Sequence, residues 1–366
     1  MSTDGSPRGP DEEPARLAGS SVRAGTTNRR HLLRGAAGIG LALPFIAPAI
    51  ARADDAHHAA GTSVPGGYVG SDAGGPSTGQ QSPVPAGQAV FTRYDPFLEA
   101  GAKQISVVAK DATLLVAKEV PYAAWTFDGT IPGRALRVVE GDTVDFAFRV
   151  DAAARTSHSL DFHSAKTAPD KNYKTIAPGE ELKWSFVARH PGAYMYHCGT
   201  APVLMHIGSG MYGAMIVDPK EGWPPAQELV FVQNEFYVAP GDNGVMVPDY
   251  TKMMGNGNMD YVDFNGYANQ YVEQPISVKV GEPVRIFVVN AGPNIWSSFH
   301  VVGTIFDRAC VNANPKNELF GLQSITIGPG DGACVEFTLD EPGTYPAVNH
   351  AFGHAAHGAI ALLKAE

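Results

Sequence analysis

The chain has 366 residues, a formal net charge of −10 and 17% charged residues. Its length favours about two domains, and its acidic balance argues against nucleic acid as a partner, since a phosphate-binding surface needs excess Lys and Arg. Gly and Pro make up about one residue in five, which is typical of short strands joined by turns. Twelve His and nine Met against three Cys indicate a metal site rather than a disulfide framework.

Residues 1–53 are predicted to be a twin-arginine signal peptide. Arg29-Arg30 stands directly before an apolar stretch over 35–50, and residues 51–53 have the small-x-small pattern of a signal-peptidase site. We expect an exported protein, periplasmic or extracytoplasmic, whose mature chain begins near Asp54. The alternative is a membrane anchor formed by an uncleaved signal, although the apolar stretch is short for a span and is broken by two prolines.

Residues 54–90 are predicted to be a flexible linker, because Gly, Ser, Pro and Ala dominate their composition. From residue 91 onward, β-branched and alternating runs separated by Gly, Pro and Asp turns predict strands, and no long stretch has clean helical periodicity. The fold class is therefore expected to be all-β.

An internal repeat divides the strand-rich part of the chain. Phe127-Asp128-Gly129 recurs as Phe264-Asn265-Gly266, and Pro191-Gly192-Ala193-Tyr194 recurs as Pro342-Gly343-Thr344-Tyr345. Two tandem β-sandwich domains follow from this repeat. We place these domains at residues 91–220 and 221–366, after the signal and the linker.

The two copies differ in residues that bind metals. Copy one has Tyr196-His197-Cys198 where copy two has Val348-Asn349-His350. A structural repeat has no need to differ in this way, and the asymmetry therefore points to chemistry.

A blue-copper centre is predicted in the first domain. Cys198, His206 and Met211 follow one another in one loop as Cys-x7-His-x4-Met, and His158 lies forty residues upstream. One thiolate, two imidazoles and a soft thioether are the ligand set of such an electron-transfer site. Met205 is a second candidate for the axial thioether, and the alternative to a metal centre is a buried free Cys with incidental neighbours.

A second metal site is predicted on the opposite face of the same strands. Neighbouring strand residues point to opposite faces, so His197 points away from Cys198, and His163 and Asp161 share one face. A catalytic site with an open position needs a third imidazole, for which the second domain offers His300 and His350. Three other histidines are expected to be ordinary turn or surface residues: His190, His354 and His357.

The sequence resembles the copper-containing nitrite reductases over nearly all of the chain after the linker. Four motifs carry the resemblance: HSLDFH from His158, YHCGTAPVLMHIGSGM from Tyr196, SSFHVVGTIFD from Ser297, and VNH from Val348. The resemblance implies two tandem cupredoxin-like Greek-key β-sandwich domains and two coppers per chain. It also implies a homotrimer, because in this family each type 2 copper is shared between two subunits.

Residue roles follow from the resemblance. The matching type 1 copper ligands are His158, Cys198, His206 and Met211. The matching type 2 copper ligands are His163, His197 and, across a subunit interface, His350. The matching catalytic residues are Asp161 and His300, with Val302 as the apolar residue that crowds the substrate.

The implied function is the one-electron reduction of nitrite to nitric oxide. The electron would pass between the coppers through Cys198 and His197, protons would come from Asp161 and His300, and the electron donor would be a small cupredoxin or cytochrome c. The competing interpretations are a two-domain multicopper oxidase acting on oxygen with phenols or metal ions, and an exported blue-copper electron carrier. The absence of any His-x-His motif argues against the oxidase, and the carrier has no need of a proton relay.

Two features depart from the better-known members of the family. The loop after His163 carries Lys166, Lys171 and Lys174, which either attract an anion and alter substrate choice or form a solvated face. The second domain has Cys310 and Cys334 in predicted strands, and a disulfide and two core thiols are both open there.

Overall fold

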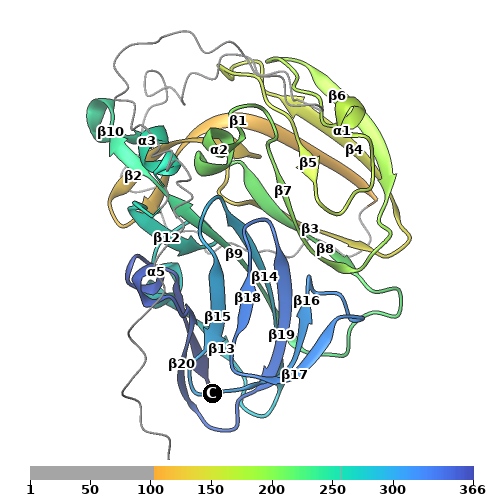
Figure 1. Ribbon diagram of the computed structural model, residues 1–366, viewed down its shortest axis with the longest axis vertical. Helices are drawn as coiled ribbons and strands as arrows, with labels where there is room; N and C mark the ends of the chain where they lie inside the picture. Colours follow the sequence, from red (N-terminus) through yellow and green to blue (C-terminus); the bar gives the residue numbers. More distant parts are fainter. Residues whose placement is uncertain (1–102, 256) are drawn as a thin grey trace, which may run out of the picture. The chain divides into compact units, whose positions relative to one another are not determined.

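Residues 104–218, together with two short strands over 238–248, form two stacked β-sheets, whose strands up to residue 218 are drawn in orange to green in Figure 1. The computed structural model describes residues 103–255 and 257–366, so the expected signal, linker and first residues of domain one lie outside the described residues. One sheet has the order β10 (Val238–Pro240), β11 (Met246–Pro248), β2 (Val120–Phe127), β1 (Gln104–Ala117), β4 (Thr143–Val150) and β6 (Glu181–Val187). The facing sheet has the order β3 (Gly133–Val139), β8 (Tyr212–Asp218), β7 (Gly192–His197) and β5 (Asp161–Phe162).

The other strands from residue 227 onward form another pair of sheets, drawn in teal to blue in Figure 1. One has the order β12 (Tyr261–Phe264), β9 (Gln227–Phe236), β14 (Pro283–Gly292), β19 (Gly332–Thr338), β16 (Phe306–Val311) and β17 (Glu318–Leu322). The other has the order β13 (Gln274–Val278), β21 (Ile360–Ala365), β20 (Gly343–Asn349), β15 (Ser297–Val301) and β18 (Ile325–Ile327). The predicted all-β fold of two tandem sandwiches is confirmed.

Helices are short and lie in the connections between strands. They are α1 (Pro169–Asn172), α2 (Val203–Gly208), α3 (Tyr250–Met254), α4 (Gln270–Glu273), α5 (Phe352–Ala356) and the 3-10 turn η1 (Asp242–Gly244). Within 103–255 and 257–366, none of them has the length and apolar character that a membrane span requires.

Alternation along the strands explains both cores. In β4 every second side chain is buried, so Val144, Phe146, Phe148 and Val150 face inward, as the two-residue period of a strand dictates. These residues pack with apolar residues of β7 and β8 into the core of the first sandwich, and the second sandwich has an equivalent core of its own. A third apolar cluster joins the sandwiches, where β7 and β8 meet β9, β14, β16 and β19.

The sequence repeat corresponds to matching tight turns. Asp128 and Gly129 have φ of 57° and 86°, and their counterparts Asn265 and Gly266 have φ of 66° and 83°. Two consecutive residues with positive φ suit Asp or Asn followed by Gly. Each turn is closed by a bridge between its flanking residues, so both copies fold this hairpin in the same way.

The expected boundary near residues 218–225 falls between β8 and β9. Two strands of the second half nevertheless belong to the first sandwich, because β10 and β11 lie at the edge of its larger sheet, where Met246 of β11 pairs with Tyr122 of β2. The division into domains at 220 stays a prediction.

A network of ion pairs accompanies the contact between the sandwiches. Arg137 of β3 pairs with Asp218 and with Glu228 of β9 at 2.7 Å each. Arg285, with only 2% of its side chain exposed, pairs with Glu228 at 2.8 Å and with Glu336 at 2.6 Å.

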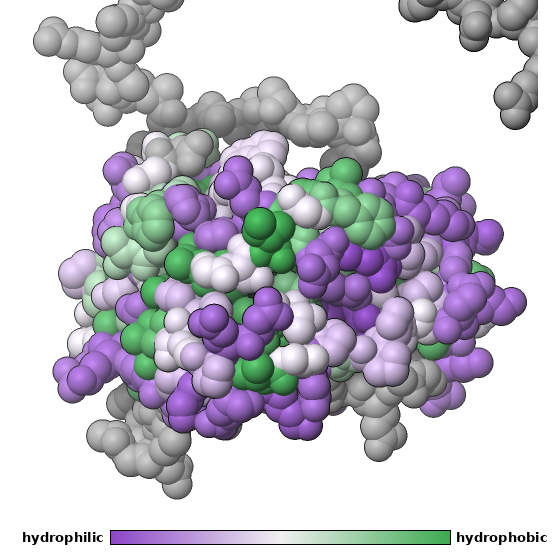
Figure 2. Space-filling view, turned by 90° about the horizontal axis from the view of Figure 1, so that it is seen from below, coloured by the Kyte–Doolittle hydropathy of each residue, from purple (hydrophilic) through white to green (hydrophobic). Residues whose placement is uncertain are grey.

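Most of the molecular surface seen from below is hydrophilic, with hydrophobic residues in separate patches (Figure 2).

Replacing Arg285 by Ala is expected to lower the free energy of unfolding by about 3 kcal/mol, because a buried side chain is removed and Glu228 and Glu336, both largely buried, each lose one of their two arginine partners. Urea unfolding measures this change. The control is Lys279→Ala, which breaks the exposed pair with Glu282 and should cost under about 1 kcal/mol. Equal losses in the two variants would contradict the prediction.

Cys310 and Cys334 lie directly opposite each other in the antiparallel pair of β16 and β19. Both are buried and both are free thiols. Burial raises the pKa of each thiol, so the two favour the neutral, unreactive form.

Candidate metal centres

The thiolate site, formed by His158, Cys198 and His206, is buried in the first sandwich. Cys198 directly follows β7, His206 lies in α2, and His158 precedes β5 in a bridge with Ile176. Their ligand atoms lie within 4.8 Å of one another. Cys198 Sγ is 3.2 Å from His206 Nδ1 and 3.9 Å from His158 Nδ1, so both imidazoles turn the same nitrogen toward the sulfur.

Electrostatics favour the thiolate form of Cys198. Burial alone would raise the pKa of the thiol, but the charges and hydrogen bonds of His206 and His158 together hold it well below its ordinary value. The backbone N–H of Ser159 also points to the sulfur, at 3.4 Å. A buried thiolate with two imidazole nitrogens fits a soft metal such as copper.

Met211 adjoins the thiolate site through its backbone. Its carbonyl accepts from the Cys198 N–H at 3.1 Å, and its own N–H donates to the His206 carbonyl at 3.2 Å. Met211 is wholly buried and Met205 is 8% exposed, and both belong to the core cluster that contains Cys198. The backbone of Met211 is thus bonded to two of the candidate ligand residues, Cys198 and His206.

The paired-imidazole site, formed by Asp161, His163 and His197, lies on the other face of β7. The register of β5 and β7 sets Asp161 opposite His197. The two Nε2 atoms of His163 and His197 are 3.1 Å apart, and one Asp161 oxygen is 4.0 Å from His197 Nε2.

Backbone carbonyls fix the tautomer of both imidazoles. His163 Nδ1 donates to the Gly330 carbonyl at 3.1 Å, and His197 Nδ1 donates to the Cys198 carbonyl at 3.0 Å. Burial, followed by the neighbouring His197, lowers the pKa of His163, which favours its neutral form. The two Nε2 lone pairs then face each other at short range, an arrangement that a cation between them stabilises.

His300 and His350 form a second pair in the second sandwich, where His300 lies on β15 and His350 directly follows β20. Their ring centroids are 5.4 Å apart, His300 Nδ1 bonds to the Gln323 carbonyl, and the His350 N–H donates to the Ser298 carbonyl at 2.8 Å. In the described part of one chain, neither belongs to the groups that could hold a metal. Val302 follows β15 and is 40% exposed.

The remaining histidines and the lysine loop lie outside both sites. His190 and His357 are exposed and His354 is half-buried beside Asn349. The three lysines after His163 are all exposed.

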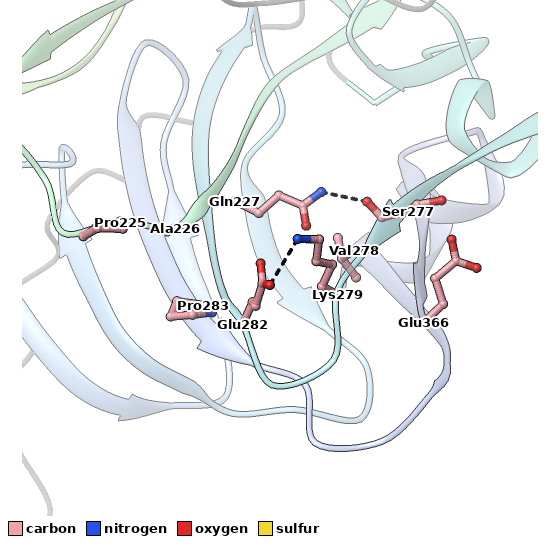
Figure 3. A pocket seen from close by; sticks show the side chains of 9 residues that line it. All are labelled: Pro225, Ala226, Gln227, Ser277, Val278, Lys279, Glu282, Pro283 and Glu366. Atoms are coloured by element: carbon pink, nitrogen blue, oxygen red, sulfur yellow. Dashed lines mark hydrogen bonds and ion pairs between the residues drawn. The ribbon is translucent and has the colours of Figure 1, made fainter.

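A pocket in the second sandwich is a less suitable candidate. Its lining contains no His or Cys, and four of its polar residues already bond in pairs: Gln227 donates to the Ser277 carbonyl, and Lys279 pairs with Glu282 (Figure 3). Nothing in this lining matches a metal centre.

Two supporting residues, Trp125 and Ser159, had no recognisable signal in the sequence, and a third, Gly330, had only an indirect one. The Trp125 ring lies 4.4 Å from that of His206 and 5.4 Å from that of His158, centroid to centroid. Ser159 donates toward the thiolate, and Gly330 anchors His163 from the other sandwich. Gly330 had one indirect signal, since it lies in a repeated Pro-Gly turn, but its contact with His163 crosses 167 residues.

Comparison with known proteins identifies related chains. A family model described as multicopper oxidase matches residues 109–222, a range that includes both sites. A copper-containing nitrite reductase of Neisseria meningitidis is 40% identical over 270 residues, covering 72% of this chain and 68% of that protein.

Solved structures agree with this relationship. The copper nitrite reductase of Nitrosomonas europaea is 39% identical, with a TM-score of 0.68 over 72% of this chain and 93% of that one. A Cu-containing nitrite reductase of Thermus scotoductus is 32% identical, with a TM-score of 0.65 over 72% of this chain and 61% of that one.

Proposed function

The chain belongs to the family of copper-containing nitrite reductases, and from that membership we propose how its residues divide the reaction. The reaction is the copper-dependent reduction of nitrite, NO2− + 2H+ + e− → NO + H2O. One observation carries the division: two imidazole Nε2 atoms face each other beside a carboxylate, one peptide bond from a buried thiolate.

We assign the thiolate site to type 1 copper and the paired-imidazole site to type 2 copper. The ligands of the first would be His158, Cys198, His206 and, through its thioether, Met211. When bound, copper supplies one-electron chemistry at the thiolate site and a Lewis-acidic position for nitrite at the paired-imidazole site. Because Cys198 and His197 are neighbours in the chain, a single peptide unit connects the two sites covalently.

Asp161 and His300 are the proposed sources of the two protons. Asp161 lies beside His197 Nε2, where its carboxyl group can bond to a bound oxyanion and pass a proton to it. The ring of His300 is oriented by the Gln323 carbonyl, and an imidazole in this position can hold and pass on a proton. Val302, exposed near His300, would limit the space left for the substrate.

The third imidazole at the type 2 site is proposed to be His350 of a neighbouring subunit in a homotrimer. Its exposed position beside His300, apart from His163 and His197 of the same chain, supports this arrangement. One subunit would then supply His350 and His300, and its neighbour would supply His163 and His197.

Subunit complementation tests the shared site. His163→Ala and His350→Ala are each expected to be inactive as pure proteins, whereas oligomers mixed from both regain part of the activity, because one interface then holds all native ligands. A mixture of His163→Ala with His197→Ala is the control and should stay inactive, since both lesions fall on the same side of every site. Failure of the first mixture to recover, with mixing verified by mass, would contradict sharing.

Gly330→Ala is expected to weaken copper binding at the type 2 site about tenfold, as losses of a ligand's supporting bond do. Gly330 has φ of +82°, and an added Cβ would lie 3.2 Å from His163 Cε1. Copper titration followed by electron paramagnetic resonance measures the loss. Gly281→Ala, with φ of +76° and open space around it, controls for backbone strain alone.

Nitric oxide release from nitrite by copper-loaded protein with a reduced dye tests the function itself. The expected result is nitric oxide at two coppers per chain. Oxygen uptake without nitric oxide would instead support an oxidase, the related activity suggested by the multicopper oxidase match. One copper per chain without nitric oxide would indicate an electron carrier.

The electron donor and the cellular compartment are the subject of two further proposals. We propose a small cupredoxin or cytochrome c as donor, which would dock near α2, where Val203 and Leu204 are partly exposed close to His206. The Arg29-Arg30 motif and the apolar stretch after it support export to an extracytoplasmic compartment. Fractionation of cells producing the Arg29→Lys, Arg30→Lys double variant tests this route.

A further inference from the structure

One ring nitrogen of His158 lacks a partner. His158 turns Nδ1 toward Cys198 Sγ, and its Nε2 is buried with no hydrogen-bond partner among the described residues. If Nδ1 binds copper, the ring proton must sit on Nε2. A buried N–H of a ligand imidazole calls for an acceptor, and such acceptors usually orient the ring.

Asp111 offers an acceptor on the same side of the ring. In the register of β1 and β2, Asp111 is directly opposite Trp125, and directly opposite residues share one face of the sheet. The Trp125 ring contacts the His158 ring edge-on, at 5.4 Å between centroids. The Asp111 side chain therefore projects toward the face on which His158 lies.

The charge environment of Asp111 points to the same neighbour. Burial raises the pKa of its carboxyl group, and His158 is the strongest of the groups that oppose this rise, followed by Arg155. The backbone N–H of Arg155 donates to the carboxylate, which ties it to the loop that leads into His158. One carboxylate oxygen, Oδ1, is buried and has no partner among the described residues.

We propose that Asp111 accepts the Nε2–H of His158, directly or through one buried water, and is a positioning residue that sets the reduction potential at the thiolate site. The proposal joins two unpaired buried polar atoms, one donor and one acceptor. A carboxylate bonded to a ligand imidazole makes that ligand more basic and favours the more highly charged, oxidised metal. Asp111 thereby lowers the reduction potential at the thiolate site, so that the reduced metal there gives up its electron more readily toward His197.

The inference rests on the proposed role of His158 as a ligand, and the experiment separates the two. Potentiometric titration of the blue absorption band compares copper-loaded wild type with Asp111→Asn, which keeps the side-chain shape and removes the charge. We expect the oxidised-to-reduced equilibrium to shift about tenfold toward the reduced form, a rise of about 59 mV for one electron. Asp111→Ala, which removes the acceptor, should shift in the same direction and also alter the band position.

The matched control is Asp151→Asn. Asp151 acts electrostatically on Asp111 but bonds to the Ala153 N–H instead, so its removal tests the loss of one nearby charge. Its equilibrium should move less than about twofold, in line with a screened surface charge. Equal potentials in Asp111→Asn and Asp151→Asn, with copper content and circular dichroism unchanged, would overturn the proposal. A blue band that survives His158→Ala would instead overturn the ligand assignment.

Discussion

Asp161→Asn is expected to retain both coppers and to lose roughly 100-fold or more of its nitrite turnover, the range expected when a general acid is removed. The amide keeps the shape of the carboxyl group beside His197 Nε2 but cannot donate an acidic proton to the substrate. Steady-state nitric oxide release, with copper counted in the same sample, measures the effect.

The control for this variant is Asp145→Asn, an exposed carboxylate on β4. It should turn over nitrite like the wild type. The pattern to look for in Asp161→Asn is a fall in kcat with native copper content, because a lost ligand would instead show as missing copper. Full activity at two coppers per chain would rule out Asp161 as a proton source.

Cys198→Ala is expected to abolish the blue absorption band and to reduce turnover with a protein donor by more than about 100-fold, beyond what the loss of a merely supporting residue costs. In the proposed assignment the thiolate is the soft ligand that selects copper at this site, and the peptide unit between Cys198 and His197 is the covalent link to the second site. The paired-imidazole site should still bind one copper, because none of its ligand atoms belongs to Cys198.

Cys310→Ala provides the matched control for this variant. It removes another buried thiol, from the contact between the sandwiches, and should leave the band and the turnover intact. Both variants lose a similar buried volume. Comparable thermal stability, with the blue band absent from Cys198→Ala and present in Cys310→Ala, would therefore isolate the role of the thiolate. A blue band in Cys198→Ala would contradict the assignment of the type 1 site.

Local spacing was sufficient to identify residues that fold into one loop. Cys198, His206 and Met211 all lie between the end of β7 and the start of β8, in a connection that holds only the short helix α2, so few conformations keep them apart. His163 and His197 were found through strand alternation, because opposite faces follow from the two-residue period alone. The β-sandwich fold was equally accessible, since the turns that define it recur in both copies.

Contacts that depend on strand register could not be read from the sequence. Asp111 reaches the neighbourhood of His158 only because β1 pairs with β2 in one particular register. Gly330 reaches His163 only because the two sandwiches pack together. The direct opposition of Cys310 and Cys334 has the same origin. Each contact joins residues whose separation along the chain carries no periodic signal.

The placement of β10 and β11 has a consequence for how this chain can be divided or rebuilt. A fragment that stops after Asp218 would lose β10 and β11 and would uncover the outer edge of β2 around Tyr122, where backbone groups could then pair with strands of other molecules. A gene fragment encoding the first copy alone is therefore a poor candidate for a minimal electron-transfer module. Grafting residues 238–248 back onto it would be the first step in making it autonomous.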